Sequence, residues 1–145
     1  MDYKIWMEKH YADICKQYDL SVHKAGDRVY ALVGHGFMVL FTLEIDDVVV
    51  SYIRRDIEEQ LLEWYLDSYI MNYIHDEDRI GLQDARSVKE MKQNAFLIVE
   101  RVLKRDFTNL LQGDTAWMNQ YLTSKYARKP RVPRSDIKAF AEERL

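Results

Sequence analysis

The chain has 145 residues, of which 48% are hydrophobic and 31% are charged, and its formal net charge is −3. These values are typical of one folded domain over residues 1–145 and exclude a disordered chain. The single cysteine, Cys15, excludes an intrachain disulfide, and no apolar run approaches the roughly 20 residues that span a bilayer. Because the N-terminus also lacks the pattern of a signal peptide, we expect a cytoplasmic protein without a membrane partner.

The first half of the chain predicts one helix followed by strands. Asp2 is placed to cap a helix that runs to about Tyr18, and a short strand is expected at Ser21–Lys24. Three runs rich in Val, Ile, Phe and Tyr then follow with short turns between them: RVYALV, FMVLFTLE and VVVSYI. They predict an antiparallel meander of three to four strands, with the second run at its centre because both of its faces are apolar.

From Asp56 the apolar spacing becomes helical and continues to about Ile74. This pattern predicts a long helix with a wide apolar stripe and an acidic polar face. The acidic face carries Glu58, Glu59, Glu63 and Asp67. The next segment, HDEDRIGLQD, predicts a solvated acidic loop.

The spacing of Ser87 and Glu90 is that of a capping box, and it predicts the longest helix, which reaches Leu111. Gly113 and Asp114 follow in the sequence LLQGDTAWMNQYL, which is either a helix joint or a ligand-binding loop. A helix joint needs only a glycine at positive φ and an aspartate that caps the next helix. The complete order predicts an α+β fold: an N-terminal helix, the meander, and three to four helices packed on the sheet.

Several motifs contain residue types that are used in catalysis or metal binding. Cys15 lies on the apolar face of the first helix, where a thiol is inert, and the glycines of Gly34–Gly36 suit a hairpin turn. The HDED sequence at His75–Asp78 has metal-binding residue types but lacks the spacing of a calcium loop or a zinc site. Glu59 and Glu63 are four residues apart, and an exposed pair of this kind favours solubility over acid–base catalysis. We therefore expect no enzyme activity, no cofactor and no metal.

The charge is unevenly distributed along the chain. Residues 125–145 carry seven Lys or Arg and three Asp or Glu, whereas residues 1–124 carry 14 and 21. An acidic body disfavours nucleic-acid binding, which needs clustered cations, and favours a basic protein partner. The basic segment near residue 125 has two interpretations, a nucleic-acid contact or a segment that is solvated or docks on the chain itself. Its cations are Lys125, Arg128, Lys129, Arg131 and Arg134.

Two motifs give the sequence a resemblance to a known class. The first is a strand pair with two glycines, and the second is the late helix joint. They comprise Val33, Gly34, Gly36, Phe37, Val39 and Phe41, and then Leu110, Leu111, Gly113, Asp114 and Trp117. In these motifs, and loosely over residues 1–126, the chain resembles the small immunity proteins that bacteria encode beside secreted polymorphic toxins, as in contact-dependent inhibition, Rhs and type VI secretion systems.

The resemblance implies an immunity protein that binds and neutralises a cognate protein toxin by direct contact. A basic nuclease domain would suit the acidic body as such a toxin. The alternative is a small nucleic-acid-binding regulator that uses the basic C-terminal segment. For the first function we expect the partner-binding residues to be Asp46, Asp47, Glu58, Glu59, Glu63, Asp67, Asp76, Glu77 and Asp78.

Overall fold

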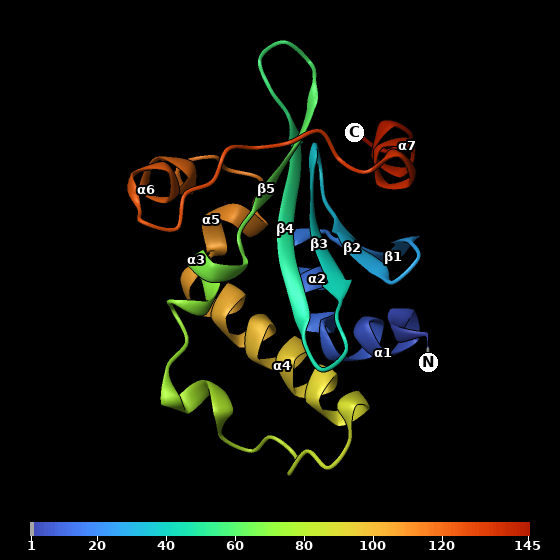
Figure 1. Cartoon of the computed structure of the whole chain (residues 1–145), viewed down its shortest axis with the longest axis vertical. Helices are drawn as coiled ribbons and strands as arrows, with labels where there is room; N and C mark the ends of the chain where they lie inside the picture. Colours follow the sequence, from blue (N-terminus) through green and yellow to red (C-terminus); the bar gives the residue numbers. More distant parts are fainter. Residues whose placement is uncertain (1) are drawn as a thin grey trace.

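The computed structural model of the chain describes residues 2–145 and has the α+β fold that the sequence predicts. Helices come first, a five-stranded antiparallel sheet follows, and further helices complete the chain (Figure 1). Each strand pairs with its neighbours in the sequence, so the sheet is a meander in the order β1-β2-β3-β4-β5. The strands are β1 (Ser21–Gly26), β2 (Val29–Val33), β3 (Phe37–Leu43), β4 (Val48–Arg55) and β5 (Leu61–Tyr65).

Two short helices, α1 (Tyr3–His10) and α2 (Ala12–Tyr18), occupy the region where the sequence predicts one helix. Asp2 caps α1 as expected, because its carboxylate accepts a backbone hydrogen bond from the first turn at 2.9 Å. The break lies at Tyr11, whose φ and ψ of −103° and 13° are not helical. Its ring is fully buried and its hydroxyl donates to the carbonyl of Phe96, which ties the break to the core.

The central strand β3 is apolar on both faces, and the structure buries both. Phe37, Val39 and Phe41 belong to the larger core, which lies between the sheet and most of the helices. Met38 and Leu40 point to the opposite face, where they join a smaller core. The sheet is therefore the middle of three layers, with a thick helical layer on one face and a thin one on the other.

The thick layer is dominated by α4 (Val88–Asp106), which begins where the sequence predicts. Ser87 caps this helix, since its side-chain oxygen accepts a hydrogen bond from the Glu90 backbone at 3.2 Å. The predicted helix to Leu111 is interrupted at Phe107, and α5 (Thr108–Leu111) follows as a separate turn. No helix within residues 2–145, α4 included, combines the length and the apolar character needed to cross a bilayer.

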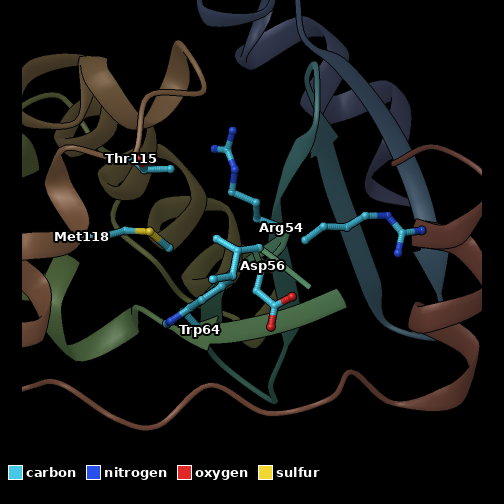
Figure 2. Close-up of a pocket in the computed structure, with 7 residues that line it drawn as sticks. Arg54, Asp56, Trp64, Thr115 and Met118 are labelled. Carbon is cyan, nitrogen blue, oxygen red and sulfur yellow. The ribbon is translucent and has the colours of Figure 1, made fainter. Parts of the chain in front are cut away.

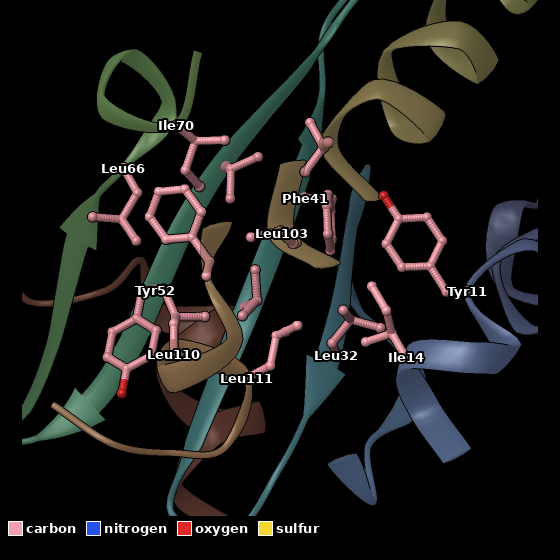
Figure 3. Packing of buried hydrophobic residues seen from close by; sticks show 14 of the residues in the cluster. Tyr11, Ile14, Leu32, Phe41, Tyr52, Leu66, Ile70, Leu103, Leu110 and Leu111 are labelled. Atoms are coloured by element: carbon pink, nitrogen blue, oxygen red, sulfur yellow. The ribbon is translucent and has the colours of Figure 1, made fainter. Parts of the chain in front are cut away.

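Figure 3 shows how the two sides of the larger core meet. Leu103, Leu110 and Leu111 come from α4 and α5, and they lie in one buried cluster with Phe41 and Tyr52 from the sheet. All five side chains are at most 1% exposed. Burying one large apolar side chain contributes about 1.5–3 kcal/mol, so this cluster is a principal source of stability.

The thin layer on the opposite face consists of α7 (Ser135–Glu142) and the chain segment that leads to it. Ile137 and Ala141 of α7 are buried against the smaller core. The segment between α6 (Trp117–Thr123) and α7 crosses the sheet (Figure 1) and pairs with the outer edge of β5. The basic segment thus docks on the chain itself, which is one of the two interpretations that the sequence left open.

The helix predicted from Asp56 to Ile74 is wrong. β4 continues to Arg55, a turn follows, and β5 returns along β4 as an additional strand. Only Asp67–Met71 is helical, as the short α3. The sheet therefore has one strand more than the sequence predicts, and the acidic residues of this region do not share a helix face.

The error has a specific physical cause. The five residues of β5, LLEWY, are compatible with the apolar spacing of a helix and also with a strand, because apolar residues occur on both faces of the strand. Trp64 and Tyr65 favour extended structure, and the exposed edge of β4 offers a complete ladder of hydrogen bonds. Asp56, which resembles a helix cap, instead accepts hydrogen bonds from Glu58 N and Gln60 N within the turn, both at 2.9 Å.

The segment LLQGDTAWMNQYL is a helix joint. Gly113 has a φ of +82°, and its backbone N–H bonds to the Leu110 carbonyl at the end of α5. Asp114 accepts a hydrogen bond from Ala116 N at 2.9 Å and so closes the turn that leads into α6. Trp117 then packs its ring against that of Tyr52, with centroids 4.9 Å apart. The glycine therefore has the role that the sequence predicts, whereas Asp114 orders the turn and does not cap α6, whose N-cap is Ala116 and has no side-chain cap.

Gly113 offers a matched test of backbone and packing costs. Gly113→Ala and Gly36→Ala should each lose about 1–2 kcal/mol, because both positions have positive φ. A Cβ at Gly113 would lie 3.1 Å from Cε1 of Phe37, whereas a Cβ at Gly36 meets nothing within 4 Å. Gly113→Ala should therefore be the less stable variant by about a further 1 kcal/mol in urea melts. Equal losses would show that the Phe37 ring moves aside freely.

Candidate functional site

The acidic residues expected to form the partner-binding surface lie at separate places in the fold. Four of them were aligned only by the helix that the structure replaces with a hairpin. The positions are Asp46 and Asp47 in the β3–β4 turn, Glu58 and Glu59 in the β4–β5 turn, Glu63 in β5, Asp67 in α3, and Asp76, Glu77 and Asp78 in the 3-10 helix η1 (Asp76–Arg79). Their surroundings decide which of them can meet a partner.

The two acidic turns lie at opposite ends of β4. One turn precedes Val48 and the other follows Arg55, so an extended strand of eight residues separates them. At about 3.3 Å per residue this strand is about 26 Å long. Figure 1 shows the two turns at opposite ends of the sheet. We therefore treat them as separate candidate surfaces.

Two of the nine acids are engaged inside the protein. Glu63 is 8% exposed; it accepts a hydrogen bond from Ser51 Oγ at 2.6 Å and lies 3.4 Å from Nε of Arg131. Asp67 is half-buried and accepts a hydrogen bond from Val50 N at 3.1 Å, and burial raises its pKa. These carboxylates serve the fold and do not present a free charge to a partner.

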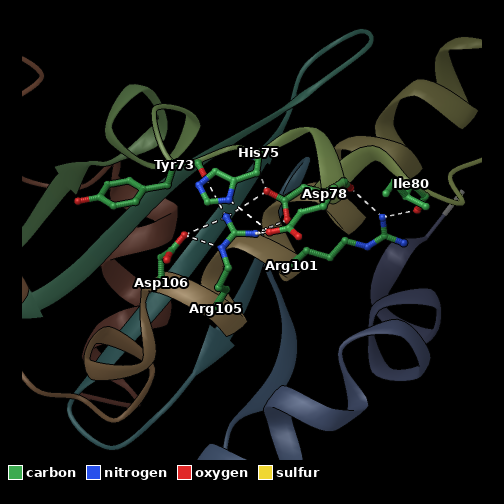
Figure 4. Close-up of polar contacts among 8 residues, drawn as sticks. Tyr73, His75, Asp78, Ile80, Arg101, Arg105 and Asp106 are labelled. Atoms are coloured by element: carbon green, nitrogen blue, oxygen red, sulfur yellow. Dashed lines mark hydrogen bonds and ion pairs between the residues drawn. The ribbon is translucent and has the colours of Figure 1, made fainter.

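Asp78 is a third internal acid, so the expectation of a solvated acidic loop is wrong at this position. It is 3% exposed and is held by Arg105, whose Nη1 and Nη2 donate to its two oxygens at 2.5 and 3.1 Å (Figure 4). The backbone of His75 donates to it at 2.7 Å. The hydrogen bonds from the Arg105 guanidinium lower the pKa of Asp78, against the opposing effect of burial.

The same contacts fix the loop to α4. Arg101 donates to the carbonyls of Asp78 and Ile80 at 2.7 and 2.8 Å (Figure 4). Asp76 and Glu77 remain exposed, although Glu77 also lies 3.5 Å from Arg105. A motif with metal-binding residue types is thus a structural clamp, and within residues 2–145 no group of three His, Cys, Asp or Glu side chains converges.

The β4–β5 turn is the most prominent surface feature. It projects beyond the helices at one end of the molecule (Figure 1), and Ile57 at this turn is 99% exposed. Glu58 and Glu59 follow it and are also exposed. The turn is well ordered by its own contacts, since Arg55 Nη1 donates to the Glu59 carbonyl at 2.6 Å and Asp56 accepts two backbone N–H groups. It therefore presents an isoleucine and two carboxylates on a fixed support.

A groove of about 400 Å³ lies at the base of this hairpin (Figure 2). One wall comes from the hairpin, and the other comes from Thr115 in the joint before α6 and from Met118 in the first turn of α6. The lining residues are Arg54, Arg55, Asp56, Ile57, Trp64, Thr115 and Met118. Apolar side chains from both walls and charged groups from β4 share this space.

The groove gives the helix joint a second role. Arg54 Nη1 donates to the Gly113 carbonyl at 2.8 Å, so β4 and the joint are connected directly. The two interpretations of LLQGDTAWMNQYL therefore do not exclude one another, because the turn that links two helices also forms a wall of a groove. Sequence reasoning missed Arg54, Trp64 and Met118 as site residues. The pairing of the two strands brings Trp64 to the joint, and no local pattern signals that pairing.

The basic segment is largely engaged with the chain itself. Arg131 forms an antiparallel bridge with Glu63, with backbone N–O distances of 2.8 and 3.0 Å, and its side chain lies beside the Glu63 carboxylate. Arg134 pairs with Asp136 at 2.6 Å, Arg128 stacks on the ring of Tyr65 at 4.4 Å, and Lys125 and Lys129 are exposed. Three of the five cations of this segment therefore contact groups of the chain itself.

Cys15 belongs to α2 and is half-buried. Burial and the nearby charge of Glu8 raise the pKa of its thiol, so the reactive thiolate is disfavoured. A shallow groove beside it contains His23, whose ring nitrogen pairs with Ser21 Oγ at 2.9 Å and not with the thiol. This geometry lacks the thiol–imidazole contact that activates a cysteine nucleophile.

No family model matches the chain, and no curated protein or solved structure is significantly similar to it. The resemblance to immunity proteins therefore depends on the two motifs alone, and both have structural roles here. Gly34–Gly36 forms the turn between β2 and β3, and Gly113 and Asp114 form the helix joint.

The Asp78–Arg105 clamp predicts a specific acid sensitivity. Asp78→Asn should lower the free energy of unfolding by about 3 kcal/mol near pH 7, because Arg105 loses its buried counter-charge. The folded pKa of Asp78 lies below the unfolded value of about 3.9. The pair therefore stabilises the fold above that pH and loses its contribution as the pH falls through the folded pKa.

Urea melts from about pH 7 down to about pH 3 should show the difference between parent and variant shrinking with acid. The control is Asp76→Asn, which removes an exposed carboxylate from the same short helix. It should change stability by less than about 0.5 kcal/mol throughout. A parent–variant difference for Asp78→Asn that is independent of pH would contradict the assigned ion pair.

Proposed function

We propose that this chain is an immunity protein, which binds a cognate bacterial toxin protein and neutralises it through the β4–β5 hairpin. The observation that carries the proposal is the projecting turn with Ile57 almost completely exposed beside Glu58 and Glu59. Contact with a partner would remove the apolar surface of Ile57 from water, and the two adjacent carboxylates would attract a basic partner to the turn.

The chemistry of the turn favours a basic partner. Two neighbouring carboxylates attract a cationic surface and accelerate association, and Ile57 would be desolvated at the centre of the contact. A toxin domain that binds nucleic acid, such as a nuclease, has the required cationic cleft. The turn is also held before binding by Asp56 and Arg55, so little conformational entropy is lost on association.

This mode of action needs no catalytic group, cofactor or metal, because occlusion of the toxin is sufficient. It places the protein in the cytoplasm of the cell that it protects, where its single cysteine suits the reducing conditions. Of the residues expected from the sequence, Glu58 and Glu59 belong to the proposed contact. Asp46, Asp47, Asp76 and Glu77 lie on other surfaces and are secondary candidates.

The alternative function, nucleic-acid binding through the basic segment, has weaker support. Arg131 and Arg134 are paired with carboxylates and Arg128 is stacked on Tyr65. Binding to phosphates would require these internal contacts to be given up or shared. Lys125 and Lys129 alone are a small cationic surface on a chain of net charge −3.

The test uses the C-terminal domain of the protein that is encoded by the gene directly upstream of the gene for this chain. Co-expression of this chain should restore growth to cells that produce that domain, and the two purified proteins should form a complex. Reversal of both charges in Glu58→Lys/Glu59→Lys should slow association by about tenfold or more at low salt. Surface plasmon resonance at two salt concentrations measures this rate.

The matched control is Asp46→Lys/Asp47→Lys, which makes the same charge change at the other end of β4. It should leave the association rate within about threefold, because only long-range electrostatics change. Equal slowing by both variants would remove the hairpin from the proposed contact. Failure of the parent protein to protect cells or bind the upstream domain would overturn the proposed function itself.

A further inference from the structure

Arg54 occupies an unusual position at the base of the hairpin. It lies on β4, is half-buried, and points toward the helix joint (Figure 2). Its Nη1 donates two hydrogen bonds, to the Tyr52 hydroxyl and to the Gly113 carbonyl, each at 2.8 Å. These two bonds use both protons of Nη1 and fix the plane of the guanidinium.

The other side of this guanidinium has no partner. Nε and Nη2 of Arg54 donate to no group in residues 2–145, and Arg54 forms no ion pair there. Arg105, Arg131 and Arg134 each lie beside a carboxylate of the chain, so a guanidinium of this protein that has such a neighbour pairs with it. Nε and Nη2 are the pair of donors that binds a carboxylate side-on, through two parallel hydrogen bonds.

The surroundings of Arg54 suit an apolar group next to that carboxylate. Trp64, Met118 and Ile57 contribute apolar surface to the same groove. Its volume of about 400 Å³ falls in the range of sites that hold a small ligand or a few side chains. Trp64 is itself supported by Tyr52, with ring centroids 6.1 Å apart, so this wall is fixed by packing.

The charge of the groove favours one carboxylate over a phosphate. Arg54, Arg55 and Asp56 line the groove, so two positive charges and one negative charge leave one positive charge, which balances a monoanion and not a dianion. One carboxylate matches the single unpaired guanidinium face and leaves the apolar walls for the group that carries it. Ile57 lines the groove and also belongs to the projecting turn, so a protein that contacts the turn also covers the groove.

We propose that this groove binds an acidic side chain of the partner protein together with a neighbouring apolar side chain, with Arg54 holding the carboxylate through Nε and Nη2. The identity of the partner rests on the proposed function, whereas the ligand chemistry follows from the groove alone. This contact is compatible with a basic partner. Cationic groups of the partner would face Glu58 and Glu59 of the turn, and one carboxylate of the partner would enter the groove and face Arg54.

The test uses the whole protein and two blocked dipeptides, acetyl-Phe-Glu-amide and acetyl-Phe-Gln-amide. They differ only in the charge of one side chain. NMR titration at millimolar peptide should shift the Nε–Hε signal of Arg54 and the indole N–H signal of Trp64 with the Glu peptide. The Gln peptide should bind about tenfold or more weakly, because it lacks a charge-assisted bidentate contact. Equal responses, or none at Arg54, would overturn the proposal.

Phenylacetate is a third probe, which separates a free small carboxylate from a peptide. We expect phenylacetate to bind more weakly than the Glu peptide. Tighter binding of phenylacetate would indicate that the groove takes a small-molecule carboxylate and would overturn the proposal. None of these titrations contains a toxin. A failed upstream-toxin experiment and a failed peptide titration are therefore distinguishable results.

Two conservative variants locate the effect. Arg54→Lys keeps the charge but cannot form the side-on pair, and it should lose about tenfold in affinity for the Glu peptide. Arg134→Lys is the matched control, since Arg134 lies outside the groove and its Nε and Nη2 already donate to Asp136 at 2.6 and 2.8 Å. It should bind the peptide within about twofold of the parent. If Arg54→Lys fails to fold, the comparison of the two peptides on the parent protein decides alone.

Discussion

The antiparallel ladder between β4 and β5 is the interaction on which the candidate surface depends. It extends from the Ser51–Tyr65 pair to the Arg55–Leu61 pair. Because of this ladder the β4–β5 turn projects from the rest of the protein, and Trp64 lies opposite the helix joint. The ladder also turns the backbone of Glu63 outward, where the C-terminal segment pairs with it. The projecting tip, the groove and the docking of the basic segment all follow from this one pairing.

An edge strand such as β5 exposes unpaired backbone groups, and here other parts of the chain cover it. Arg131 closes the edge at Glu63 with two backbone hydrogen bonds, and the Tyr121 hydroxyl donates to the Tyr65 carbonyl at 3.0 Å. Protection of this kind suppresses edge-to-edge association between sheets. It ends before the projecting turn, which leaves the tip as the part of the hairpin that is free to meet another molecule.

Acidic residues that form internal ion pairs do not contribute free negative charge to the surface. Asp78 and Glu63 are acidic in the sequence, but they are buried partners of Arg105 and Arg131. The number of acidic residues therefore overstates how much acidic surface is available, although each internal pair leaves the net charge unchanged. At the hairpin, Glu58 and Glu59 are exposed at the turn, and Arg54 at its base has no ion-pair partner in residues 2–145. This arrangement is more specific to one partner than an overall negative charge is.

The sequence by itself determined the fold class, the β-meander as far as Ile53, the start of the long helix at Ser87 and the positive-φ joint at Gly113. These features depend on alternation, caps and glycine, which act between residues close in the chain. Only the tertiary structure decided that residues 61–65 form a strand and that Asp78 is buried. Both outcomes depend on partners distant in the sequence, β4 for the strand and Arg105 for the carboxylate. Local periodicity cannot encode a hydrogen-bonding edge or a counter-charge that lies elsewhere in the chain.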